Sequence, residues 1–425
     1  MKAFHLAVLS LFVASIVCAQ APRNAATPAQ QKISWAEAAI KAHPDKGQPY
    51  NDLAVAYVQR VRETADSSFY LQAEATLQKS FQISPDNLEG NKAQVMILLG
   101  RGEFAQALSL AKALNKKTPD DVLLYGFIAD AAIALGDYRE AEDAAQWMLD
   151  MRPGNVPGLL RGAALRRLYG DAPGARDFFS QAYQQMAPTQ TEELAWTLTQ
   201  MADLQLSSGD IDGAEQLLRS ALQQFPGYYA SLEELAKVQT AWQHYPEAVE
   251  LLRQRNQNLP TAASRYALAQ ALERAGQTTE ADVAYRDFVA GARALMDASN
   301  NRNQELIFYY LGHGQNPTEA LRIARLEIIK RHDVNTLDAY AWALCANAQY
   351  EDAQKQITAA LVVGVREARF FYHAGVIASK LRDDASAARY LKQSVELNPS
   401  SESAAPARHA LQQRVPTSAA ARGEQ

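Results

Sequence analysis

A short pattern returns along this chain at a constant interval. It reads Gly-Glu-Phe-Ala-Gln-Ala at residues 102–107, Gly-Asp-Tyr-Arg-Glu-Ala at 136–141 and Gly-Asp-Ala-Pro-Gly-Ala at 170–175. Looser copies stand at 209–214 and 276–281. The first three copies are 34 residues apart. A fixed period of this length indicates stacked repeats, each too small to fold alone, rather than separate globular domains.

Each repeat is predicted to be a pair of helices. Apolar residues recur at spacings of three and four, and runs of alternating Val, Ile and Thr, which would indicate strands, are missing. The glycine ends a first helix because it tolerates a left-handed cap, and the alanine five residues later lets a second helix approach closely. A proline about a dozen residues further on ends the second helix, as at Pro119, Pro153, Pro188 and Pro226.

These features resemble the tetratricopeptide repeat family, whose unit is a helix pair of about 34 residues. The resemblance is clearest between residues 335 and 399, which end in the exit motif Leu397-Asn398-Pro399, and it covers roughly residues 34–401. It implies an all-α fold, a right-handed α-solenoid superhelix of about ten helix pairs over residues 47–401. The units are expected to start near residues 47, 88, 122, 156, 195, 229, 262, 301, 334 and 368.

Three places depart from the regular spacing. Extra residues fall around Glu63–Tyr70, before Glu192, and between Phe288 and Asn300. The eighth and ninth units also lack the glycine of the turn.

Residues 1–19 have the pattern of a signal peptide. A basic start precedes an apolar run, Leu6 to Val17, and small residues precede a cut after Ala19. The run is shorter than the about 20 residues that span a bilayer. We therefore expect export to the periplasm or the extracellular space, and no membrane-spanning segment. A lipoprotein acylated on Cys18 is the alternative, although Ser15 and Val17 do not fit a lipobox.

The remaining ends are expected to flank the array. Residues 20–33 read as a flexible leader, and residues 34–46 as a capping helix with Ser34 as N-cap and Glu37 completing a capping box. Residues 402–413 can form a closing helix, and residues 414–425 a disordered tail.

The charge and the motifs of the chain argue against several classes of function. The formal net charge is −5, which argues against a general nucleic-acid binder. No phosphate-binding loop, His-Glu-x-x-His, Gly-x-Ser-x-Gly or Cys-x-x-Cys motif occurs. We therefore predict no enzyme activity, no cofactor and no metal. The family resemblance implies a scaffold that binds a peptide or protein in the concave groove formed by its first helices.

By repeat register, aromatic and charged residues of the last four units should face that groove. Tyr, Trp and Arg often dominate binding energy. The alternative is that the aromatic side chains fill gaps between adjacent helices. The candidate residues are Tyr266, Arg302, Tyr309, His313, Asp338, Trp342, Arg369, Tyr372 and Lys380.

Two further groups are weaker candidates. Arg161, Arg166 and Arg167 form a secondary basic patch that could hold carboxylates, or could simply pair with local Asp and Glu. Asp338 and His373 occupy neighbouring positions on adjacent first helices and could hydrogen-bond. With His313 they offer an alternative metal-dependent or enzymatic site, although His313 lies about two turns further along its helix. A third reading is an accessory subunit of an envelope complex, bound through its convex face.

Overall fold

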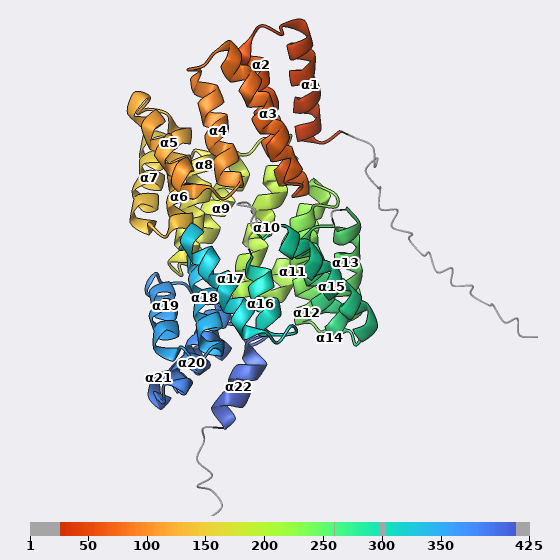
Figure 1. The fold of residues 1–425 in the computed structure, drawn as a ribbon, viewed down its shortest axis with the longest axis vertical. Coiled ribbons are helices and arrows are strands. Elements are labelled where there is room, and N and C mark those ends of the chain that lie inside the picture. Colours follow the sequence, from red (N-terminus) through yellow and green to blue (C-terminus); the bar gives the residue numbers. More distant parts are fainter. Residues whose placement is uncertain (1–25, 259, 297–302, 414–425) are drawn as a thin grey trace, which may run out of the picture.

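The computed structural model describes residues 26–258, 260–296 and 303–413, which form 22 helices and no strand (Figure 1). The predicted all-α fold is confirmed. Ten helix pairs stand between α1 (Pro28–Ala42) and α22 (Ala404–Gln412). The first helices of the pairs are α2 (Gly47–Thr64), α4 (Leu88–Gly100), α6 (Val122–Leu135), α8 (Val156–Leu168), α10 (Thr191–Ser207), α12 (Tyr229–Ala241), α14 (Ala262–Arg274), α16 (Gln304–Leu311), α18 (Val334–Ala346) and α20 (Ala368–Lys380). The second helices are α3 (Ser68–Ile83), α5 (Phe104–Lys117), α7 (Tyr138–Met151), α9 (Ala172–Gln185), α11 (Ile211–Gln224), α13 (Tyr245–Asn258), α15 (Thr278–Ala294), α17 (Pro317–Lys330), α19 (Tyr350–Val362) and α21 (Asp384–Leu397).

The turn inside each pair marks the repeat in the backbone. From the second pair onward, each turn carries a residue with positive φ: Gly102, Gly136, Gly170, Gly209, Gln243, Gly276, Gln315, Ala348 and Arg382. The intervals between these residues are, one by one, the same as those between the predicted unit starts from residue 88 to residue 368. The ninth unit makes this turn with a left-handed Ala348, and the sixth and tenth units make it with Gln243 and Arg382. The eighth unit has a longer turn, in which Gly312 and Gly314 precede the left-handed Gln315.

The small residue of the motif lies where the two helices of a pair meet. Ala107, Ala141, Ala175 and Ala214 are completely buried, and Ala281 nearly so. A larger side chain at these positions would separate the helices, because protein interiors are close-packed. The role predicted for the motif alanine is confirmed.

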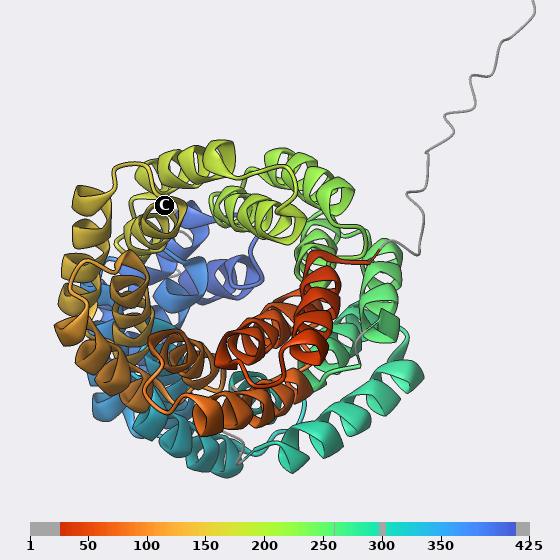
Figure 2. The ribbon, with the colours of Figure 1, turned by 90° about the horizontal axis from the view of Figure 1, so that it is seen from above.

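The first helices line the inside of the superhelix. Those of neighbouring pairs pack on each other more closely than the second helices do. In a curved array the more closely spaced helices lie on the concave side. Viewed from above, the helices are arranged in a ring (Figure 2).

The superhelix is right-handed and completes more than one turn, so that its second turn packs under its first (Figures 1 and 2). The contact between turns, here called the seam, includes hydrogen bonds that involve backbone atoms. His332 N donates to Ala134 O at 3.0 Å, and Val334 N donates to Tyr138 Oη at 3.0 Å. Asn398 Nδ2 donates to Leu206 O at 2.9 Å, across 192 residues of sequence. The repeat pattern predicts contacts between neighbouring units and gives no sign of the seam.

The N-terminal cap starts earlier than the sequence suggested. Helix α1 begins at Pro28, so the last residues of the expected 20–33 leader are helical. Thr27 is the N-cap and forms a capping box with Gln30, whereas Ser34 lies within the helix. The capping box predicted at Ser34 and Glu37 is therefore wrong, because the same pattern occurs earlier in the chain, just before a proline suited to the first helical position. The signal peptide and the 414–425 tail lie outside the described residues.

Two of the irregular spacings appear as longer helices. Helix α2 has 18 residues and α10 has 17, against 13 in α4, α8 and α12. Each gains about one turn, α2 at its C-terminal end and α10 at its N-terminal end. The third irregular stretch falls partly outside the described residues. Within the described part of the chain, none of the helices is long and apolar enough to cross a bilayer.

Candidate functional site

The predicted groove residues gather in two groups on the C-terminal half of the array. Tyr266, Tyr309 and His313 join Tyr285 and Phe288 in what is here called the tyrosine cluster. Asp338, Trp342, Arg369 and Tyr372 join His373 and Phe308 in the tryptophan cluster. Lys380 lies at the end of α20. Arg302 lies outside the described residues.

The tyrosine cluster is built around one stacked pair. The His313 ring lies on that of Tyr285, with centroids 4.0 Å apart. Tyr285 Oη donates to Glu273 at 2.7 Å, and His313 Nδ1 lies 3.3 Å from the same carboxylate. Burial, followed by the hydrogen bond to Glu273, raises the pKa of Tyr285, so the phenol stays protonated at neutral pH. Tyr285 was missed in the sequence because it lies on a second helix, α15, whose side chains were not expected near the inner surface.

The tryptophan cluster rests on a buried ionic network. Asp338 is fully buried and lies 2.7 Å from His373 Nδ1 and 3.0 Å from Arg369 Nε. Arg369 Nη2 also donates to Asn335 at 3.1 Å. The predicted Asp338–His373 hydrogen bond is confirmed. Burial alone would raise the pKa of Asp338, but the charges of His373 and Arg369 lower it.

This network fixes the orientation of Trp342. Its ring stacks on His373 with centroids 4.1 Å apart and planes within 11°. Because Asp338 holds His373, the indole has a firm support on one side. Trp342 and Tyr309 are both half-buried and pack against the largest apolar core cluster. Trp342 and Tyr309 therefore each pack against the core with one part of the side chain and leave another part accessible.

The three residues of the alternative metal site do not come together. His313 belongs to the tyrosine cluster, with Glu273 and Asp282 beside it. Asp338 and His373 belong to the tryptophan cluster. Among residues 26–258, 260–296 and 303–413, no group of three or more His, Cys, Asp or Glu is placed to hold a metal ion. Cys345 is a buried free thiol whose pKa burial raises to about 11, as expected for a small core residue rather than a nucleophile.

A belt of charges crosses the inner face of α8, α10 and α12. Lys237 Nζ lies 2.6 Å from Glu234, and its side chain is still 54% exposed. Asp203 and Glu233 lie close enough to act on the same ammonium group. Burial lowers the pKa of Lys237, but the three carboxylates raise it by more. Lys237 therefore keeps its charge, and the inner face here is polar.

Each arginine of the secondary basic patch is paired with a carboxylate. Arg161 pairs with Asp130, and Arg166 lies 2.6 Å from Asp171. Arg167 lies 2.5 Å from Asp203 and 3.6 Å from Glu367, which belongs to the second turn. The patch is thus a set of local ion pairs, one of which bridges the two turns.

Comparison with known proteins agrees with this architecture. Family models described as tetratricopeptide repeat match residues 92–156, 205–273 and 339–402. No curated protein matches the chain.

Solved structures similar to the chain are distant in sequence. A human IFIT1 dimer with PPP-AAAA is 13% identical, with a TM-score of 0.48 over 86% of this chain and 85% of that one. Yeast Tom70 is 12% identical, with a TM-score of 0.41 over 91% and 93%. PilW, a widely conserved type IV pilus biogenesis factor, is 15% identical, with a TM-score of 0.41 over 49% and 92%. These likenesses carry no inference about a ligand or a partner.

Proposed function

Since the chain belongs to the tetratricopeptide repeat family, we propose that it is a non-catalytic scaffold that binds a peptide or protein on the inner surface of its superhelix. Repeats of this family indicate a protein-interaction scaffold. We further propose that the scaffold works in the periplasm or outside the cell, after removal of the signal peptide near Ala19, and that its partner is not a nucleic acid.

The observation that carries the proposal is the half-buried Trp342 on its ionic support. A rigid aromatic side chain loses little conformational freedom on binding and often anchors an interface. Tyr309, Tyr372 and Tyr266 lie on the neighbouring first helices and extend the aromatic surface along the same side of the array.

The partner is to be identified by crosslinking and mass spectrometry of the native envelope fraction. Its affinity is then measured for the unaltered chain and for Trp342→Ala and Tyr309→Ala, with folding checked by circular dichroism. A loss of about 30-fold or more, the mark of a hot spot, supports the inner surface. Unchanged affinity in the double variant rejects it.

A specific observation favours the convex face as the second candidate. Ile329 and Val362 are 77% and 80% exposed at the ends of α17 and α19, and they occupy equivalent positions in consecutive units. Apolar side chains mark an interaction surface where they form a continuous exposed patch, and these two recur at the same place in successive units. Ile329→Ser and Val362→Ser therefore serve as the matched control, since loss of binding in these variants alone moves the interface outward.

The proposed location has its own test. The chain expressed with its leader is recovered from cell fractions, and its N-terminal residue is determined. A mature N-terminus at Gln20 in the exported fraction supports the proposal, while an intact Met1 in the cytosol contradicts it.

A further inference from the structure

The extra turns of α2 and α10 meet across the superhelix. Arg62 stands in the last turn of α2 and Glu192 in the first turn of α10, far apart in sequence. Arg62 Nη2 lies 2.8 Å from Glu192 Oε2. The Glu192 side chain is fully buried, while that of Arg62 is 47% exposed. The two irregular spacings seen in the sequence thus supply the two halves of one ion pair.

The surroundings hold both groups in place. Tyr228 Oη donates to Glu192 Oε1 at 2.9 Å, so the buried carboxylate has a partner on each oxygen. Each charge also suits its helix end, since cations are favoured at a C-terminus and anions at an N-terminus. Tyr70, at the start of α3, fills the space beside Gly100, where any β-carbon would collide with its ring.

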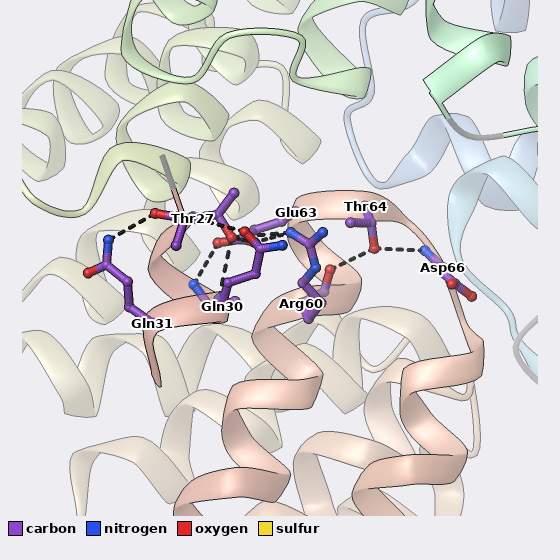
Figure 3. Close-up of polar contacts among 9 residues, drawn as sticks. Thr27, Gln30, Gln31, Arg60, Glu63, Thr64 and Asp66 are labelled. Atoms are coloured by element: carbon purple, nitrogen blue, oxygen red, sulfur yellow. Dashed lines mark hydrogen bonds and ion pairs between the residues drawn. The ribbon is translucent and has the colours of Figure 1, made fainter. Parts of the chain in front are cut away.

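The N-terminal cap is tied to the same end of α2 (Figure 3). Glu63, next to Arg62, is buried and accepts hydrogen bonds from Ala29 N at 2.8 Å and Arg60 Nη1 at 2.7 Å. It also accepts one from Thr27 Oγ1. The start of α1 is therefore fixed to α2 at the site of the ion pair, so α1 follows α2 in any movement of that end.

Closure of the superhelix depends on contacts between distant units. In a repeat array each unit is stabilised by its immediate neighbours, and small rotations between units change the pitch. In the part of the chain that the structure describes, contacts of the longer range include the seam, the Arg62–Glu192 pair and an Arg274–Glu402 pair at 2.8 Å. Losing them would let the coil open while every helix pair stays folded. In the view from above, the red N-terminal helices lie toward the middle of the ring of helices (Figure 2).

We propose that the Arg62–Glu192 pair is a latch that holds the N-terminal end of the coil against α10, and that its release lets that end move away and widens access to the inner surface while the seam keeps the two turns together. This inference rests on the proposed function in one respect, because the opening admits a partner only if that partner binds at the inner surface. The opening itself does not depend on any partner, so it can be tested alone.

The test measures access to the inner face with a cysteine probe at Lys237. The chain carries Lys237→Cys together with Cys18→Ala and Cys345→Ala. Labelling rates are compared for a small maleimide and for a maleimide on a large polyethylene glycol chain. The double variant Arg62→Gln/Glu192→Gln removes both charges at once, so neither group is left buried and unpaired.

The matched control is Arg253→Gln/Glu280→Gln. This pair has the same chemistry and a distance of 2.7 Å, but it joins neighbouring units, α13 and α15. If the pair is a latch, the labelling rate of the bulky maleimide, divided by that of the small one, should rise several-fold in the Arg62→Gln/Glu192→Gln variant. The same ratio should not rise in the control. An unchanged ratio in the Arg62 variant, or an equal rise in both, overturns the proposal.

A second measurement does not rely on chemistry at residue 237. Spin labels at Ser34→Cys on α1 and Gln254→Cys on α13, both exposed positions, report the distance distribution across the latch. Release of the latch is expected to lengthen and broaden that distribution, and Arg62→Lys, which keeps the charge, to restore most of it. Identical distributions in the unaltered chain and the Arg62→Gln/Glu192→Gln variant contradict the latch.

Discussion

Two fully buried carboxylates, Asp338 and Glu192, hold the array together in different ways. Asp338 pairs with His373 and Arg369 on the next first helix, α20. Glu192 pairs with Arg62, which comes from a helix several units earlier in the chain. His373 and Arg369 lower the pKa of Asp338 in spite of its burial. Burial raises the pKa of Glu192 by more than Arg62 lowers it, and nearby Glu193 adds to the rise.

The two carboxylates therefore have different roles: Asp338 stabilises the contact between neighbouring repeats, and Glu192 holds distant repeats together. The Asp338 network has two partners, Arg369 and His373, and joins neighbouring repeats, so it is part of what keeps each unit folded. The Glu192 pair has one cation, half exposed, and joins distant repeats. Its carboxylate is held at a net electrostatic cost, which suits a contact that can be released. The experiments below are ordered from the largest expected effect to the smallest.

Asp338→Ala should cost about 3–5 kcal/mol of unfolding free energy, because it leaves Arg369 and His373 without the buried carboxylate that they share. Urea unfolding followed by circular dichroism measures the cost. Asn335→Ala, which removes only a hydrogen bond to Arg369, is the control and should cost about 1 kcal/mol. Equal losses of unfolding free energy in the two variants would show that the buried ionic network does not contribute to stability.

Arg62→Gln should cost about 2–3 kcal/mol, less than a fully buried pair because Arg62 is half exposed and screened. Glu192→Gln should be nearly neutral, since the amide oxygen still accepts from Tyr228 and the desolvated charge is gone. The double variant should therefore be more stable than Arg62→Gln alone. Additive costs in this cycle would show that the two groups do not interact.

Gly170→Ala and Gly276→Ala separate the seam from the repeat turn. Both glycines have positive φ, so alanine is strained at each by about 1–2 kcal/mol. A β-carbon on Gly170 would also lie 2.6 Å from Gly364 O in the second turn, whereas one on Gly276 meets nothing within 4 Å. Gly170→Ala should cost about 1–2 kcal/mol more in thermal or urea unfolding. A smaller cost at Gly170 would argue against the seam.

The two carboxylates should also give opposite pH dependences. The lowered pKa of Asp338 contributes stability at neutral pH that is lost as pH falls below about 4. The raised pKa of Glu192 works the other way, and its contribution is lost as pH rises from about 4 through the folded-state value. As pH rises from mildly acidic to neutral, the unaltered chain should therefore lose stability relative to Glu192→Gln. If the unaltered chain instead gains stability relative to Glu192→Gln as pH rises, the pKa of Glu192 is lowered rather than raised in the folded chain.

Local features of the array were readable from the sequence. The intervals between turns, the buried alanines and the Asp338–His373 pair all follow from repeat register, because each depends on residues in the same unit or the next. The predicted cap at Ser34 was wrong since two overlapping patterns competed and only the helix start could decide between them. Tyr285 was missed because register alone does not reveal that a second-helix side chain reaches His313.

The sequence by itself determined that this chain is a stack of helix pairs, about how many there are and where each one turns. Periodicity records the contacts that recur between neighbours. Tertiary structure alone decided that the second turn rests on the first through Ala134, Tyr138 and Leu206, and that Arg62 finds Glu192. These contacts occur once each, and they depend on the accumulated rotation of many units. A short-range sequence pattern does not specify the accumulated rotation of many units.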